Sequence, residues 1–128
     1  MRRYAREVVF CLTYEYLFTN NINDLQLDLF SRKDLTADDV DYIKNTYGGI
    51  IENFDALHET VAGLSKGFKA DRIYKVDLAI LILATYELSF TDIPAEICIN
   101  EAVEIAKKFS TDKSVGFVNG ILAQVCKK

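Results

Sequence analysis

The chain has 128 residues and a formal net charge of −4, and half of its residues are hydrophobic. A chain of this length and apolar content is expected to form one domain, residues 1–128, that folds without disulfides or structural metals. The acidic balance argues against a general nucleic-acid binder, and the longest uncharged apolar run, residues 78–84, falls far short of the roughly 20 residues that cross a membrane. We therefore expect a cytoplasmic protein with no membrane association.

Helical periodicity dominates the first third of the chain. Residues 3–18 carry apolar side chains at spacings of three and four, which predicts an amphipathic helix. Asn20 and Asn21 punctuate the chain, and a short second helix is expected at residues 22–30. The predicted core stripe of the first helix comprises Ala5, Val8, Val9, Leu12 and Tyr16.

A long helical pattern follows Thr36, which is a plausible N-cap because acidic residues occupy the next turn. The pattern continues to about residue 65, with Gly67 as the expected C-cap. Gly48 and Gly49 lie inside it and predict a kink or a close helix crossing.

Residues 76–88 form the most apolar segment, with hydrophobic side chains around nearly the whole circumference. A helix of this kind is central and buried. A buried strand is the competing interpretation, but 13 residues exceed a typical strand and no partner strand is evident.

Two further helices are expected near the C-terminus, one from Pro94 to about Phe109 and one over residues 114–125. The predicted fold class is therefore all-α, with six or seven helices in two small bundles around a central apolar helix.

Charge is distributed unevenly along the chain. Residues 1–6 contain three arginines and no acid, and residues 107–128 contain five lysines against one aspartate, so both ends are basic while the middle is acidic. If the ends meet in the fold, they form a local basic patch that attracts phosphate groups. The alternative is that both ends are merely solvated.

The first helix has a second face outside the predicted core stripe. Phe10, Tyr14 and Leu17 lie there, continuous with Arg3 and Arg6. Aromatic rings and guanidinium groups on an outward face suit a protein interface or stacking on unpaired RNA bases. Burial of both faces within a bundle is the equally weighted alternative.

No catalytic or metal-binding motif occurs in the sequence. His58 is the only histidine and is expected to be exposed on a helix, and the three cysteines, which form no C-x-x-C pair, are expected to be buried thiols in a reducing compartment. We expect no enzyme activity, no cofactor and no metal.

Four blocks of the sequence resemble the NusB family in the order in which that family carries them. They are residues 2–7 (RRYARE), residues 77–88 with the pattern D-x-x-x-L-x-x-A-x-Y-E-L, residues 93–94 followed by 99–107 (INEAVEIAK), and residues 117–122 (FVNGIL). Together they span nearly the full chain. The sequence is thus identified as similar to a transcription antitermination factor.

The resemblance implies an all-helical RNA-binding protein that binds single-stranded boxA-like RNA of ribosomal RNA operons. It further implies a protein partner, the small-subunit ribosomal protein NusE, and action within the transcription elongation complex. The basic opening implies RNA contacts by Arg2, Arg3 and Arg6.

The last helix carries the other implied RNA contacts, Phe117 and Asn119, while Tyr14 and Asp77 match positions on the side facing NusE. Lys113 stands where an acid is common and is expected to assist phosphate binding. Gly116 stands where a lysine is common, which removes one contact. Phe10 and Leu17 complete the expected partner-binding face.

Two alternatives remain open at this point. Both are rivals to the antitermination function. In the first, the chain is a homodimeric interaction scaffold that uses the face of Phe10, Tyr14 and Leu17. In the second, it is a module related to the N-terminal domain of ribosomal RNA cytosine methyltransferases. Because the sequence as given ends at Lys128, no methyltransferase domain is expected. Dimerisation and RNA binding can coexist.

Overall fold

The computed structural model of the chain describes residues 2–23, 35–65 and 73–126. These residues form helices only, which confirms the predicted all-α class. The six helices are α1 (Arg2–Thr19), α2 (Ala37–Glu52), α3 (Phe54–Leu64), α4 (Lys75–Phe90), α5 (Ala95–Phe109) and α6 (Asp112–Cys126).

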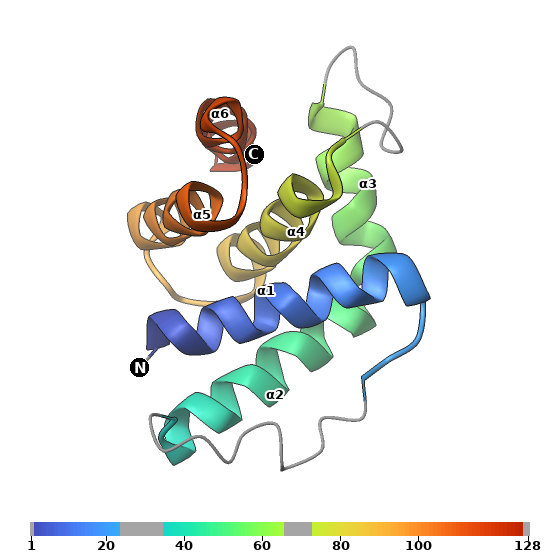
Figure 1. Cartoon of the computed structure of the whole chain (residues 1–128), viewed down its shortest axis with the longest axis vertical. Coiled ribbons are helices and arrows are strands. Elements are labelled where there is room, and N and C mark those ends of the chain that lie inside the picture. Colours follow the sequence, from blue (N-terminus) through green and yellow to red (C-terminus); the bar gives the residue numbers. More distant parts are fainter. Residues whose placement is uncertain (1, 24–34, 66–72, 127–128) are drawn as a thin grey trace.

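Helix α4 is the centre of the fold, as its continuous apolar sequence predicted. It packs against each of the other five helices, with α1, α2 and α3 on one side and α5 and α6 on the other (Figure 1). Residues 78–84 are each at most 2% exposed. A helix enclosed in this way needs no polar face, so the strand alternative is wrong and the two-bundle prediction is confirmed.

Thr36 caps α2 as predicted, since its hydroxyl accepts a hydrogen bond from the backbone N–H of Asp39 at 3.1 Å. Gly48 and Gly49 do not interrupt α2, which runs through both glycines. The chain breaks at Asn53 instead. Its backbone N–H and its side-chain amide both donate to the carbonyl of Gly49, at 3.1 and 2.8 Å, so Asn53 caps the last turn of α2 with two hydrogen bonds.

Gly49 marks a close helix crossing, the other half of the same prediction. A Cβ atom at this position would overlap the ring of Tyr86 on α4, whereas a Cβ at Gly48 would meet no atom within 4 Å. The crossing of α2 over α4 therefore depends on one of the two glycines.

Some predictions fall outside the described residues, namely most of the helix expected at 22–30, the C-cap at Gly67 and the charges of Lys127 and Lys128. Of the cysteines, only Cys98 is buried, so the prediction of three buried thiols is wrong for Cys11 and Cys126. None of the helices in the described ranges combines the length and apolarity that a membrane crossing requires.

Candidate nucleic-acid and partner-binding surfaces

Arg6 is buried between α1 and α4 in a polar network. Its Nε and Nη2 atoms donate to the two carboxylate oxygens of Glu87 at 2.8 and 3.1 Å, and Nη1 donates to Glu101 Oε1 at 3.2 Å. The hydroxyl of Tyr42 donates to the same Glu87 carboxylate at 2.9 Å. Burial lowers the pKa of Arg6, but the hydrogen bonds and charge of Glu87 outweigh it and raise the pKa overall.

The prediction that Arg6 lies on an outward face is wrong. The side chain is 6% exposed, because it points at Glu87 of α4 and Glu101 of α5 rather than at solvent. A guanidinium held by two carboxylates is committed to the interior, so Arg6 is unsuited to contact RNA.

Arg2 and Arg3 extend from the same end of α1 and are about half exposed. Arg2 Nε lies 3.3 Å from Asp39 Oδ1, and its guanidinium lies 4.4 Å from the centre of the Tyr42 ring. Arg3 donates to Glu101 from Nη2 at 2.7 Å and from Nε at 3.2 Å. The hydrogen bond from Arg3 is the largest of the effects that hold the pKa of Glu101 below its ordinary value. Both arginines are therefore exposed but already paired.

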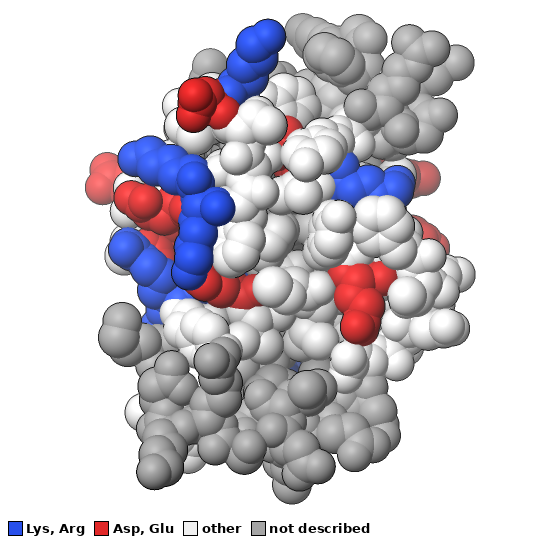
Figure 2. All heavy atoms as spheres, in the orientation of Figure 1, with Lys and Arg blue, Asp and Glu red and all other residues white. Residues whose placement is uncertain are grey.

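A groove between α1 and α5 brings cations from the two ends of the sequence together. It has a volume of about 340 Å³, and Arg3 of α1 faces Lys107 and Lys108 of α5 across it. Lys108 Nζ bonds Glu7 Oε1 at 2.8 Å. Lysine and arginine side chains gather over α5 and the start of α1, with acidic side chains between them (Figure 2). The prediction that the two basic ends come together is confirmed for Arg3, Lys107 and Lys108.

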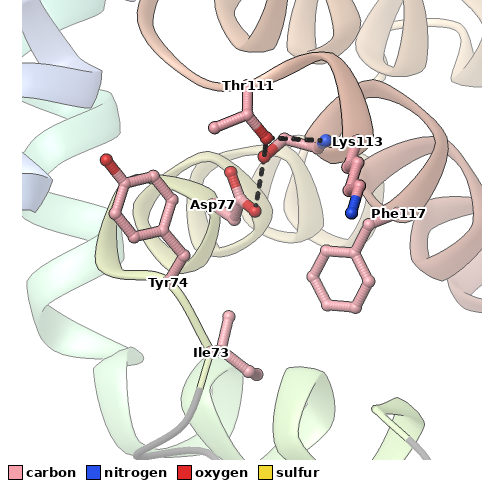
Figure 3. Close-up of a pocket in the computed structure, with 7 residues that line it drawn as sticks. Ile73, Tyr74, Asp77, Thr111, Lys113 and Phe117 are labelled. Carbon is pink, nitrogen blue, oxygen red and sulfur yellow. Dashed lines mark hydrogen bonds between the residues drawn. The ribbon is translucent and has the colours of Figure 1, made fainter.

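Phe117 and Lys113 lie in a second pocket, of about 370 Å³, at the opposite end of α4. Tyr74 and Phe117 stand on opposite sides of this pocket with Asp77 between them (Figure 3). Arg6 contacts Glu87, ten residues after Asp77, which is about 15 Å along the helix. Arg6 and Phe117 thus do not share one site, so the RNA contacts predicted for these two residues do not lie on one surface.

Asp77 is an internal anchor at the base of this pocket. It is 5% exposed, and its two carboxylate oxygens accept hydrogen bonds from Ser110 at 2.6 Å and Ser114 at 2.9 Å. The backbone N–H of Ser114 bonds the Thr111 hydroxyl at 3.2 Å, which caps the start of α6. Asp77 therefore positions α6, and direct contact of its carboxylate with a protein partner remains a prediction.

Asn119 faces away from this pocket into a groove of about 520 Å³ between α5 and α6. Lys107 lines both this groove and the groove between α1 and α5. Gly116, exposed and without a side chain, separates Asn119 from Phe117 on the surface of α6. The two α6 residues predicted to contact RNA thus lie on opposite flanks of one helix, with a low ridge between them.

The aromatic face of α1 is smaller than predicted. Phe10 is 4% exposed and packs on Phe109 of α5 with ring centres 5.2 Å apart, so its assignment to an exposed binding face is wrong. Tyr14 and Leu17 are half-buried against the core. Phe18 is 58% exposed and packs edge to face on Tyr14, with ring centres 4.9 Å apart. It extends the aromatic surface to the end of α1.

Sequence reasoning missed the acids that hold the arginines, Glu87 and Glu101. It also missed the pocket residue Tyr74 and its neighbour Lys75, whose amine lies 5.9 Å from the centre of the Phe18 ring. One signal was available. Glu87 is a charge in an otherwise buried helix, and such a charge requires a buried partner of opposite sign.

Comparison with known proteins gives one consistent family. The NusB family model matches residues 3–127. The chain is 41% identical over 128 residues to the transcription antitermination protein NusB of Acetivibrio thermocellus, covering 98% of this chain and 88% of that protein. It is also 41% identical to the protein of the same name from Natranaerobius thermophilus, covering 97% and 93%.

Solved structures agree with this result. The structure of T. maritima NusB superposes with a TM-score of 0.89 at 34% identity, covering all of this chain and 92% of that one. A structure of the antitermination factors NusB and NusE in complex with double-stranded RNA contains a chain with a TM-score of 0.84 at 22% identity, covering 98% of this chain and 96% of that one. The second likeness establishes the shared fold alone.

Proposed function

This chain belongs to the NusB family, and on that premise we propose that it binds single-stranded boxA-type RNA of ribosomal RNA operons together with NusE, within the transcription elongation complex. A transcription antitermination factor acts by binding rather than by catalysis. The solved complex of similar fold contains NusB, NusE and double-stranded RNA, which supports NusE and RNA as the classes of partner.

The single observation that carries the RNA-binding proposal is the shared groove of Arg3, Lys107 and Lys108. These cations come from opposite ends of the sequence and lie on one surface of a protein whose net charge is −4. Arginine and lysine bind phosphate oxygens without regard to base identity, so they fix the position of a strand. Arg2 lies at the same end of α1 and extends this phosphate-binding surface.

We assign base recognition to α6. The Phe117 ring is open to the Asp77 pocket, where Lys113 can bind an adjacent phosphate and Tyr74 provides a second aromatic surface. Unpaired RNA bases stack on such rings and are then distinguished by polar groups at their edges. Asn119 supplies an amide on the other flank of α6, and the bare ridge at Gly116 lets a strand pass between the two flanks.

We assign NusE binding to the exposed end of α1, where Tyr14, Leu17 and Phe18 form an aromatic and aliphatic surface. Asp77 contributes by holding α6 at the pocket that contains Phe117. Because this surface and the Asp77 pocket adjoin the same end of α4, one partner protein can contact both and add cations to the RNA site. Binding of the partner then raises RNA affinity through linkage.

The test is a fluorescence-anisotropy titration of boxA-like and scrambled RNA, with and without NusE, at stated salt concentrations. Phe117→Leu removes the stacking ring and is expected to weaken boxA-like RNA binding about five- to a hundredfold, the range of base–aromatic stacking. Phe90→Leu is the matched control, because Phe90 is an exposed α4 aromatic that stacks on Tyr86 instead. Equal losses from both variants would contradict the assignment.

The partner surface is tested separately with Tyr14→Asp. This variant is expected to weaken NusE binding while leaving RNA binding by the chain alone unchanged. Sedimentation with and without RNA detects the homodimer considered above, and a dimer that RNA does not dissociate would favour the scaffold alternative.

A further inference from the structure

Acidic side chains hold the exposed cations that line the groove between α1 and α5. Arg3 pairs with Glu101 at 2.7 Å and Lys108 pairs with Glu7 at 2.8 Å. Each pair joins α1 to α5 across the groove, and we call them the clamp pairs. Two of the three cations that the proposed function needs for phosphate are thus already bound to carboxylates across the groove. The third, Lys107, lies 3.9 Å from Glu104 within α5.

Glu101 is arranged as a phosphate would be. Its carboxylate accepts two parallel hydrogen bonds from the Arg3 fork and a third from Arg6 Nη1 at 3.2 Å. A guanidinium binds phosphate oxygens with the same two-point geometry. The Glu101 side chain is 12% exposed and that of Arg3 is 54% exposed, so an incoming phosphate can reach Arg3 only beside the fixed negative charge.

We propose that Glu101 and Glu7 are intramolecular competitors for RNA phosphate, and that they restrain the RNA affinity of the free chain. This inference rests on the proposed function, because it concerns the same phosphate-binding groove. Glu101 is the stronger competitor, since Arg6 and the buried Glu87 behind it hold it in place. Glu7 holds Lys108 by a hydrogen bond and acts on Arg3 through its charge alone.

The expected size of the effect follows from the exposure of the pairs. Exposed ion pairs are weak in water, so neutralising one competitor should strengthen RNA binding by about two- to fivefold. The released cation then neutralises a further phosphate. The slope of log affinity against log salt should therefore become steeper by about one unit.

The experiment compares Glu101→Gln and Glu7→Gln with Glu59→Gln. Glu59 is exposed on α3, outside the groove, and its replacement changes the net charge by the same amount. Anisotropy titrations use two probes, a boxA-like single-stranded RNA and an oligouridylate of equal length, each at several salt concentrations. Circular dichroism and urea unfolding check that each variant is folded.

A second measurement ties the effect to Arg3. Arg3→Gln is introduced into the wild-type and Glu101→Gln backgrounds, and the gain from Glu101→Gln should disappear when Arg3 is absent. If the loss of the Glu101 charge disturbs Arg6 and the variant does not fold, Glu7→Gln decides the question through Lys108.

The outcomes separate this inference from the proposed function. Tighter RNA binding by Glu101→Gln and Glu7→Gln, with Glu59→Gln unchanged, supports competition. Equal gains in all three variants overturn it, because any lost acid would then suffice, as does the absence of a gain with either probe. If the wild-type chain does not bind boxA-like RNA but Glu101→Gln gains affinity for oligouridylate, the result supports competition for phosphate and contradicts the proposed boxA function.

Discussion

The Arg6 guanidinium and the Glu87 carboxylate form a two-point ion pair inside the protein, with N–O distances of 2.8 and 3.1 Å. The pair joins α1 to the C-terminal half of α4, and Glu101 of α5 completes it from a third helix. A buried charge is tolerated when its hydrogen bonds are satisfied, and it becomes costly when one partner is removed. Together with Glu101, this pair therefore ties α1, α4 and α5 to one another in the protein interior.

Replacement of Arg6 by methionine should destabilise the protein by about 3–5 kcal/mol, because Glu87 would stay buried without its cation. Urea unfolding followed by circular dichroism measures the loss. Arg3→Gln breaks an exposed pair in the same region and should cost far less. Comparable losses from the two variants would contradict a structural role for Arg6, as would an Arg6→Met protein that loses RNA binding at unchanged stability.

Gly48 and Gly49 should respond in opposite directions to replacement by alanine. Gly48→Ala adds a Cβ into open space on α2 and should stabilise the protein by about 0.5–1 kcal/mol. Gly49→Ala drives a Cβ into the Tyr86 ring and should destabilise it by about 1–3 kcal/mol. Urea unfolding measures both.

The cause of the second effect is tested by shortening the neighbour. In a Tyr86→Leu background, Gly49→Ala should cost less than it does in the wild type, since the overlapping ring is gone. If Gly49→Ala lowers the stability of the Tyr86→Leu protein as much as that of the wild type, the overlap with the Tyr86 ring is not the cause.

The sequence predicted the helices well because each is marked by local features. Thr36 is followed by acids, Pro94 stands directly before α5, and residues 78–84 are too uniformly apolar for a surface element. The break after α2 was missed because it depends on the side-chain amide of Asn53, which adds a second hydrogen bond to the Gly49 carbonyl, and apolar spacing does not report such a bond.

The candidate site was predicted less completely, because the spacing of apolar residues along one helix does not show how many of its faces are covered by other helices. Phe10 and Arg6 lie off the apolar stripe of α1, yet α5 and α4 cover them. The pairing of Arg3 with Glu101 joins residues 98 positions apart, and no local pattern connects them. The resemblance to a family supplied Phe117 and Asn119, which periodicity alone would have left as ordinary helix residues.

Arg3 should influence the acid stability of the protein through Glu101. The hydrogen bond and charge of Arg3 lower the pKa of Glu101 in the folded state, so this interaction stabilises the fold above the unfolded pKa of about 4.3 and is lost as pH falls through the folded value. The stability difference between wild type and Arg3→Gln should therefore be constant near neutral pH and disappear in acid. Urea unfolding at a series of pH values from 7 downward measures it.

The control for that series is the same Arg3 replacement in a Glu101→Gln background. With no carboxylate to titrate at position 101, the pH dependence of the Arg3→Gln effect should fall sharply, and only the weaker charge effects of Glu104 and Glu7 on Arg3 should remain. A difference that persists unchanged into acid would show that Arg3 stabilises the fold through something other than Glu101.

The three cysteines should separate into two reactivity classes. Cys98 is 1% exposed and burial raises its pKa to about 11, so a disulfide reagent at pH 8 meets neither an accessible sulfur nor a thiolate. Cys11 and Cys126 are exposed and should react in the native protein, with Cys11 slowed by its raised pKa. Labelling should therefore show two thiols that react at once, the early phase, and a third that reacts only after urea is added, the late phase.

The Cys98→Ala variant checks this assignment. Its early phase should still count two thiols, and its late phase should vanish. Because Cys98 packs near the Arg6 network, Arg6→Met should bring the third thiol into the early phase if that network holds α5 against α4, and an unchanged late phase would confine its effect to α1.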